Sequence, residues 1–233
     1  MAASRFQFKE FSVSQDRCAM KVGTDGVLLG AWAKACDGDL VLDIGSGTGL
    51  VSLMVAQRFP ASRVVGIEIE PEAASQALEN VADSPFADRI EIRRGDVREM
   101  EGTFQTIVCN PPFYSEHVVS PGEGRLLARS TRSLAFSQLW ECSDCLLCSG
   151  GLFNVILPIS ERVAFHALAL EHHFDLWQSC VVQTVPAKAP KRVMLCYVKG
   201  TCTPLPPQHL VLQNADGSRS AQLSRLTADF YLW

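Results

Sequence analysis

A glycine-rich turn between an apolar strand and an apolar helix constrains the fold of this chain more than any other feature. Residues 40–44, Leu-Val-Leu-Asp-Ile, have the length and composition of a buried strand. They lead into Gly45-x-Gly47-x-Gly49, and apolar residues at positions 50, 51, 53, 54 and 55 then predict a helix. This order is typical of nucleotide-binding α/β proteins. A dinucleotide fingerprint would have Gly or Ala at position 50, where this chain has Leu.

Strands and helices continue to alternate after this unit. A strand-like N-terminal arm is expected from Phe6, Phe8, Phe11 and Val13, and a helix over 24–32. Further strands are expected at 63–68, 90–96, 104–109, 151–157, 174–183 and 192–199, later helices at 132–148 and 160–172, and a short packed helix over 226–233. The alternation predicts a single-domain α/β fold, with a Rossmann-like, doubly wound, mostly parallel sheet of seven strands. We expect residues 1–38 to form an N-terminal arm with a ligand-covering loop and helix. Residues 39–233 would form the α/β domain with a short C-terminal extension.

Acidic residues stand at or near the ends of three consecutive predicted strands. Asp43 precedes the glycine loop, Glu68 ends the second strand and Asp96 ends the third. The Glu68 carboxylate can accept hydrogen bonds from both hydroxyls of a ribose, and Asp96 can accept one from an adenine amine. Helix caps or solvated strand ends would explain each acid singly, but the set of three indicates a nucleoside ligand.

The fourth strand, 104–109, runs into Asn110-Pro111-Pro112-Phe113, a turn that two prolines stiffen. A stiff turn at the carboxyl end of a strand is where open α/β sheets hold their ligands. The Asn110 oxygen and the Pro111 carbonyl can accept both hydrogens of an –NH2 group, while Phe113 stacks on the attached ring. The turn therefore suits a planar amine, although a plain surface turn would also explain Asn-Pro-Pro by itself.

Composition and cysteine spacing exclude several classes of protein. No apolar run approaches the roughly 18–20 residues of a membrane helix, and the first residues lack a signal peptide's apolar core. Nine cysteines without such a signal indicate reduced thiols and a cytoplasmic protein. Cys142, Cys145 and Cys148 have an iron–sulfur-like spacing but lack a suitable fourth cysteine, so we expect them to pack along one helix face. No metal site is predicted.

Positive charge is local in a chain whose formal net charge is −4. Lys188, Lys191, Arg192 and Lys199 cluster without an acid, and Arg125, Arg129 and Arg132 recur after the proline turn. Such clusters can meet RNA phosphates, with Arg125, Arg129, Lys188, Lys191 and Arg192 as the candidate contacts. A solvated face explains them equally well, and both readings stay open here.

At this point the chain resembles a known family, the class I S-adenosylmethionine-dependent methyltransferases. The sharper resemblance is to the bacterial enzymes that methylate N6 of the adenine beside the anticodon of valine tRNA. Four stretches carry it, namely Cys18 to Trp32, the Asp-Ile-Gly-x-Gly-x-Gly run, Asn-Pro-Pro-Phe113 and Asp-Phe-Tyr-Leu at 229–232. The resemblance covers nearly the whole chain.

The resemblance implies a tRNA (adenine-N6)-methyltransferase that uses S-adenosyl-L-methionine, with tRNA as its partner. The sequence does not specify the oligomeric state, and a monomer is our expectation. The resemblance also implies a class I methyltransferase domain over 39–233. The residues that it assigns to the cofactor are Lys21, Thr24, Asp43, Gly45, Gly47, Gly49, Glu68, Asp96 and Asn110. It assigns the target adenine to Asn110, Pro111, Pro112 and Phe113.

Other functions remain open at this stage. The same turn occurs in methyltransferases that act on a glutamine amide of a protein or on the exocyclic amine of guanine in ribosomal RNA. A cofactor-binding module without catalysis is a further alternative, and the presence of Asn110 and Phe113 weighs against it.

Overall fold

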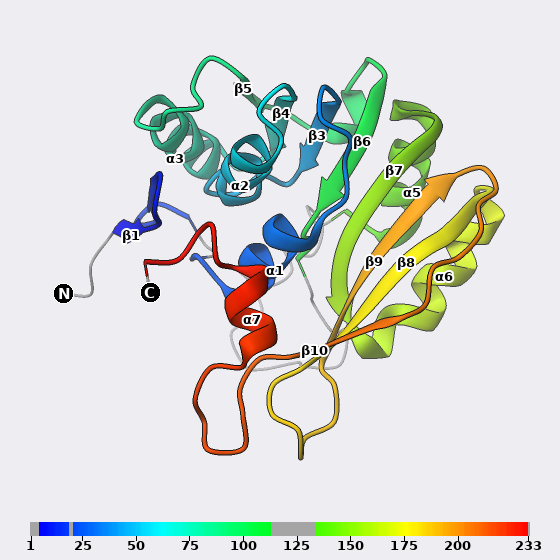
Figure 1. Ribbon diagram of the computed structural model, residues 1–233. Helices are drawn as coiled ribbons and strands as arrows, with labels where there is room; N and C mark the ends of the chain where they lie inside the picture. Colours follow the sequence, from blue (N-terminus) through cyan, green and yellow to red (C-terminus); the bar gives the residue numbers. More distant parts are fainter. Residues whose placement is uncertain (1–4, 19–20, 113–133, 233) are drawn as a thin grey trace, which may run out of the picture.

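One large sheet organises the computed structural model, which describes residues 5–18, 21–112 and 134–232 (Figure 1). Its strands lie in the order β10-β8-β9-β7-β6-β3-β4-β5. Neighbouring strands are parallel, except that β9 runs antiparallel to both β7 and β8. The strands are β3 (Leu40–Ile44), β4 (Arg63–Glu68), β5 (Ile90–Arg94), β6 (Phe104–Cys109), β7 (Leu147–Pro158), β8 (Phe174–Gln183), β9 (Arg192–Lys199) and β10 (Gln208–Val211).

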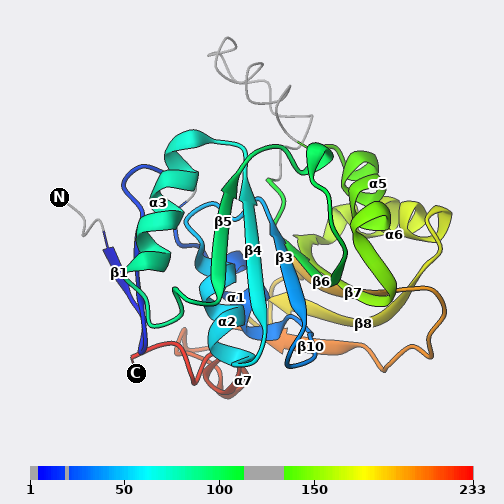
Figure 2. The same cartoon turned by 90° about the horizontal axis from the view of Figure 1, so that it is seen from above.

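Helices cover both faces of this sheet and give three layers (Figure 2). One face carries α1 (Thr24–Trp32), α2 (Leu50–Arg58), α3 (Pro71–Ala82) and α7 (Ala221–Leu226). The other carries α5 (Phe136–Leu146) and α6 (Arg162–Glu171), with the short 3-10 turns η1 (Val97–Glu99) and η2 (Ile159–Glu161) in the connections. Among the described residues, no helix has the length and apolar character needed to cross a bilayer.

The central strands are apolar on both sides because helices lie over both faces. In β3, Val41 belongs to the core beneath α1 and α2, whereas Leu42 and Ile44 belong to the core beneath α5 and α6. This division follows the alternation of side chains along a strand, and continuous apolar runs are typical of parallel strands buried on both faces. The predicted doubly wound, mostly parallel α/β fold is therefore confirmed.

Three details differ from the prediction. An eighth strand, β10, adds to the edge of the sheet beside β8, after the proline-rich stretch 203–207. The helix expected over 132–148 ends at Leu146, so Cys148 lies on β7 and does not share a helix face with Cys142 and Cys145. The short terminal helix lies at Ala221–Leu226, where Ser220 caps it, and not after residue 226.

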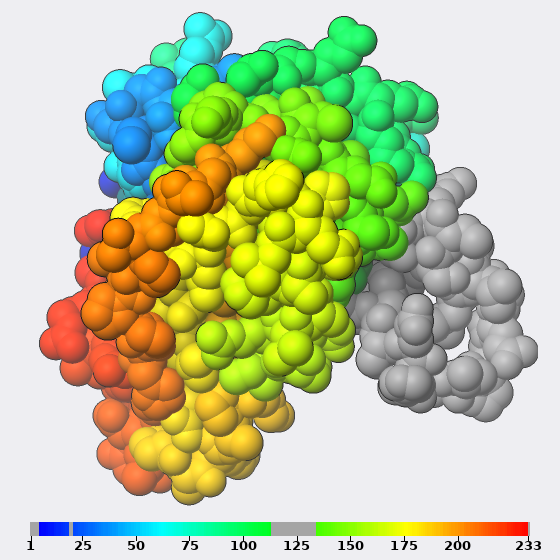
Figure 3. All heavy atoms as spheres, turned by 90° about the vertical axis from the view of Figure 1, so that its right-hand side faces the viewer, coloured from blue at the N-terminus to red at the C-terminus, as the bar shows by residue number. Residues whose placement is uncertain are grey.

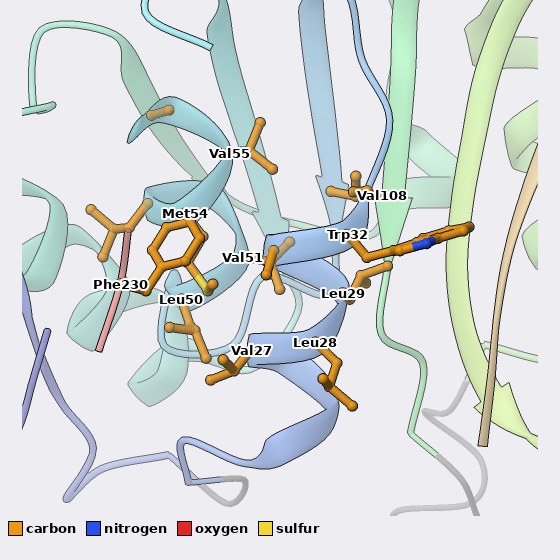
Figure 4. Packing of buried hydrophobic residues seen from close by; sticks show 14 of the residues in the cluster. Val27, Leu28, Leu29, Trp32, Leu50, Val51, Met54, Val55, Val108 and Phe230 are labelled. Atoms are coloured by element: carbon orange, nitrogen blue, oxygen red, sulfur yellow. The ribbon is translucent and has the colours of Figure 1, made fainter. Parts of the chain in front are cut away.

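Helix α1 packs directly on α2, and the side chains between them come from both helices (Figure 4). Gly30 permits this approach, because a Cβ atom there would lie 2.7 Å from the sulfur of Met54. The labelled residues are Val27, Leu28, Leu29, Trp32, Leu50, Val51, Met54, Val55, Val108 and Phe230. The boundary between the N-terminal arm and the α/β domain, at residue 38, stays a prediction. Helix α1, before it, and β3 and α2, after it, contribute to one hydrophobic cluster.

The two ends of the chain meet beside this helical layer. A hairpin of β1 (Arg5–Gln7) and β2 (Ser12–Ser14) confirms the strand-like N-terminal arm. Its Phe6 and Phe8 rings lie 6.1 and 5.7 Å from the ring of Tyr231, and Lys9 donates its backbone N–H to the carbonyl of Phe230. The Asp-Phe-Tyr-Leu segment thus anchors the arm.

Candidate active site

The glycine loop and the proline turn lie at one point of the sheet, where the order of the strands reverses. From β3 the chain proceeds to β4 and β5 on one side, and β6 then pairs with β3 on the other. Ile44 is in register with Cys109, so Gly45 and Asn110 leave the same carboxyl edge from neighbouring strands. Such a switch point is where open α/β sheets bind their ligands.

The backbone of the glycine loop requires glycine. Gly45, Gly47 and Gly49 have φ angles of 72°, 55° and 80°, in the left-handed region that side chains with a Cβ rarely adopt. A Cβ atom at Gly45 would meet no described residue within 4 Å, so the described part of the chain leaves space open above the loop. The N-terminal end of α2 follows Gly49, and the N–H groups of a helix's first turn favour a polar or anionic ligand.

Glu68 holds the glycine loop to the end of β4. Its Oε2 accepts the N–H of Gly47 at 2.9 Å, and its Oε1 accepts the N–H of Glu70 at 2.9 Å. The side chain is only 8 % exposed. Each carboxylate oxygen has a second lone pair, so Glu68 can keep both backbone bonds and still accept from two hydroxyl groups.

Asp43 lies beneath the loop and does not face the open side. It is 1 % exposed, and the Ser52 hydroxyl of α2 donates to its Oδ2 at 2.6 Å. Burial raises the pKa of Asp43 to about 6, and the hydrogen bonds from Ser52 oppose that rise. Any contribution of Asp43 to ligand binding therefore acts through the position of α2, and not through a direct contact.

Asp43 makes the free energy of unfolding fall as the pH rises, the opposite of the usual effect of a carboxylate whose pKa is lowered on folding. Because the pKa of Asp43 is higher in the folded chain, at about 6, than its ordinary value of 3.8, the folded state binds the proton more tightly. Its stabilising contribution is present below about pH 4 and is lost as the pH rises through about 6. Relative to Asp43→Asn, the free energy of unfolding should fall by about 3 kcal/mol between about pH 4 and pH 7. Urea unfolding of both proteins across this range tests it, and a constant difference would contradict it.

Asp96 lies at the start of η1 and is bound by its own neighbour. The guanidinium of Arg98 contacts both carboxylate oxygens, and the backbone N–H of Arg98 donates to Oδ1 at 3.0 Å. Arg98 holds the pKa of Asp96 below its usual range, so the carboxylate stays ionised. Its assignment to an adenine amine stays a prediction, which requires the amine to share this carboxylate with Arg98.

Asn110 presents an unused acceptor. Its Oδ1 is buried and has no hydrogen-bond partner among the residues that the structure describes. An unpaired buried amide oxygen costs about 1–3 kcal/mol, so such an atom at the switch point indicates a ligand that donates to it. Pro111 is buried and Pro112 is exposed, which keeps the turn at the surface of the sheet edge.

Two other elements bring residues near this amide. Thr24 and Asp25 open α1, and a Cβ atom at Gly26 would lie 3.9 Å from Asn110 Nδ2. Lys21 is exposed shortly before this helix. Two residues of this region were not predicted from the sequence. One is Gly26, a neighbour of Asn110. The other is Ser46 of the glycine loop, whose buried Oγ has no hydrogen-bond partner among the described residues. The only signal for Gly26 was its spacing of four from Gly30 within an apolar helix.

The basic residues singled out in the sequence lie in different surroundings. Lys188 and Lys191 are exposed on the loop between β8 and β9, which projects from the carboxyl edge of the sheet and lies at the lower end of the face in Figure 3. Arg192 instead donates to Asp25 Oδ2 at 2.8 Å. Lys199 lies at the far end of β9, where it pairs with Asp144 at 2.9 Å. Phe113, Arg125, Arg129 and Arg132 lie outside the described residues.

Cys109, the residue before Asn110, belongs to the core. It lies beneath α5 and α6, and burial raises the pKa of its thiol. Within the described part of the chain, no group of three or more His, Cys, Asp or Glu residues is arranged to hold a metal ion.

Comparisons with known proteins agree with this geometry. The methyltransferase small domain family matches residues 20–136. The tRNA1(Val) (adenine(37)-N6)-methyltransferase of Phocaeicola vulgatus is 41 % identical over 229 residues, which cover 97 % of each chain.

Two solved structures share the fold. A predicted O-methyltransferase from Agrobacterium tumefaciens superposes with a TM-score of 0.71 at 18 % identity, covering 88 % of this chain and 96 % of that one. TYW2 from Pyrococcus horikoshii, solved with MeSAdo, superposes with a TM-score of 0.61 at 15 % identity, covering 84 % and 71 %. From these matches, the chain belongs to the methyltransferase small domain family and, within it, to the tRNA1(Val) (adenine(37)-N6)-methyltransferases.

Proposed function

We propose that this protein transfers the methyl group of S-adenosylmethionine to the N6 amine of adenine 37 in valine tRNA. The observation that carries the chemistry is the unpaired, buried Oδ1 of Asn110 at the switch point of the sheet. The 41 % identity to a relative of that name, over 97 % of both chains, supports the substrate. A tRNA substrate also supports action in the cytoplasm.

The residues at the switch point fit the cofactor. The open side of the glycine loop accommodates a nucleoside close to the backbone, and Glu68 retains a free lone pair on each oxygen for the ribose hydroxyls. Asp43 and Ser52 hold α2 against this loop. S-adenosylmethionine supplies an electrophilic methyl group on a sulfonium sulfur.

Asn110 and Pro111 would prepare the adenine amine for attack. The nitrogen of an adenine amine is a poor nucleophile because its lone pair is delocalised into the ring. When the Asn110 oxygen and the Pro111 carbonyl accept its two hydrogens, the nitrogen becomes pyramidal and its lone pair is directed away from the ring. As the carbon–nitrogen bond forms, the sulfur–methyl bond would break and leave a neutral thioether, and the methylated nitrogen would then release a proton to water. The same oxygens stabilise the positive charge that develops on nitrogen, so positioning and electrostatics supply the acceleration without a strong base.

The product nucleoside tests this function. The protein is incubated with labelled S-adenosylmethionine and unmodified valine tRNA, and the tRNA nucleosides are then identified by mass spectrometry. N6-methyladenosine at position 37 is the expected product. Methylation of another nucleotide, of guanine in ribosomal RNA or of a glutamine amide in a protein would reject the substrate and leave the fold intact.

Lys188 and Lys191 should contribute to tRNA binding through phosphate contacts. Charge reversal at both positions should weaken tRNA binding and reduce the salt slope of log Kd by about 1–2, since each phosphate contact contributes about 0.7–0.9. Binding measured between low and moderate salt tests this expectation. Arg63→Glu is the matched control, because Arg63 is exposed at the amino end of β4, on the opposite edge of the sheet. An unchanged salt slope in the double variant would show that these two lysines are solvated surface residues that do not contact tRNA phosphates.

A further inference from the structure

An ion pair joins two segments that are 167 residues apart. The Nε of Arg192, the first residue of β9, donates to Oδ2 of Asp25 at 2.8 Å. Asp25 is the second residue of α1. Both side chains are partly buried, with 33 % of Arg192 and 26 % of Asp25 exposed. Partial burial reduces the screening that makes most surface ion pairs weak.

The end of α1 is fastened by several side chains. Arg58 donates to the carbonyls of Gly30 and Ala33, and the indole of Trp32 donates to Gln208 at 2.8 Å. The buried amide of Asn154 makes hydrogen bonds in both directions with the backbone of Lys34. These contacts fix the last turn of the helix and the loop that follows.

The beginning of α1 has fewer supports. Its N-cap is Gly23, which has no side chain to accept from the first turn, and the first helical bond, Val27 N–H to Gly23 O, is long at 3.3 Å. Asp25 favours this end of the helix by its charge and carries the contact to Arg192. Among the described contacts, the ion pair is the one that ties the side chain of a first-turn residue to the sheet.

This first turn adjoins the reactive position. A Cβ atom at Gly26 would lie 3.9 Å from Asn110 Nδ2 and 3.1 Å from Leu50 Cδ2, so the turn packs closely against both. A displacement of the turn would therefore change the environment of the Asn110 amide and of the glycine loop that precedes Leu50.

We infer that Arg192 is a positioning residue, which fixes the first turn of α1 beside Asn110 through its ion pair with Asp25. Arg192 thereby acts on the site through another residue and not through a phosphate of tRNA. The basic loop with Lys188 and Lys191 leads directly into Arg192. The surface expected to bind tRNA is therefore next in the chain to the ion pair that holds α1. Only the link to methyl transfer rests on the proposed function.

Hydrogen exchange of the free protein tests the inference without any substrate. We compare wild type with Arg192→Ala, Asp25→Ala and the double variant, and follow the amides of residues 24–32. Arg192→Ala should raise exchange about fivefold at Val27 and Leu28, the first amides of α1 with helical hydrogen bonds, which is the change expected from losing a partly buried ion pair. It should have no further effect in the Asp25→Ala background. Arg5→Ala, which removes an arginine paired with Asp83 on the N-terminal hairpin, is the matched control and should leave α1 unchanged.

Two further measurements separate positioning from a phosphate contact. Arg192→Lys should restore part of the protection in α1, because it keeps the charge near Asp25. Arg192→Ala should lower the single-turnover methyl-transfer rate about fivefold at saturating tRNA, with the salt slope of tRNA binding unchanged. Unchanged exchange in α1, or a reduced salt slope for Arg192→Ala alone, would overturn the inference. Failure of tRNA methylation would reject the proposed function and leave the exchange result to stand.

Discussion

Replacing Asn110 by alanine will lower the single-turnover rate of methyl transfer by about 10²-fold or more, by analogy with deleting one oxyanion-hole donor. The substitution removes one of the two oxygens that accept the hydrogens of the target amine. The fold should survive, because Asn110 Oδ1 makes no hydrogen bond to any described residue. The affinity for S-adenosylmethionine should change far less than the rate.

Asn110→Asp separates the role of the oxygen from that of the amide. It keeps an acceptor and adds a charge that stabilises the developing cation, so it should retain more activity than the alanine variant. Asn214→Ala is the matched control, since Asn214 is exposed in the loop before α7. Transfer of labelled methyl to unmodified tRNA measures all three variants. A wild-type rate for Asn110→Ala would reject the catalytic role.

Replacing Glu68 by alanine will weaken binding of S-adenosylmethionine by about 10²-fold or more. Two hydrogen bonds from the ribose to a charged acceptor are lost, at about 1.5–3 kcal/mol each. The variant also releases the N–H groups of Gly47 and Glu70, which Glu68 accepts at 2.9 Å, so the glycine loop loses its anchor. Both effects act in the same direction.

Isothermal titration of the free protein measures this affinity. Glu68→Gln keeps one acceptor oxygen and should fall between wild type and Glu68→Ala. Glu72→Ala is the matched control, since Glu72 is exposed in the first turn of α3. Equal affinity of wild type and Glu68→Ala would reject the assignment of Glu68 to the ribose, and tighter binding of NAD than of S-adenosylmethionine would reject the cofactor.

The predicted elements that proved right are those whose signal is local. The apolar run 40–44, the glycines that follow and the apolar face of α2 specify a strand, a turn with positive φ and a helix in immediate succession. The family resemblance lies in the same short motifs and is confirmed by the comparisons. Edges and ends were harder to predict. Strand β10 follows three prolines in 203–207, and its place in the sheet comes from pairing with β8.

For the site, the sequence by itself determined which residue types stand at the carboxyl ends of β3, β4 and β6, because strand ends and turns are local features. Only the tertiary structure decided what each side chain contacts. It buried Asp43 against Ser52, left Asn110 Oδ1 without a described partner and joined Arg192 to Asp25 across 167 residues. Such contacts depend on how helices pack on the two faces of the sheet. The spacing of apolar residues indicates which face of a helix or strand is buried, but not which distant residue packs against that face.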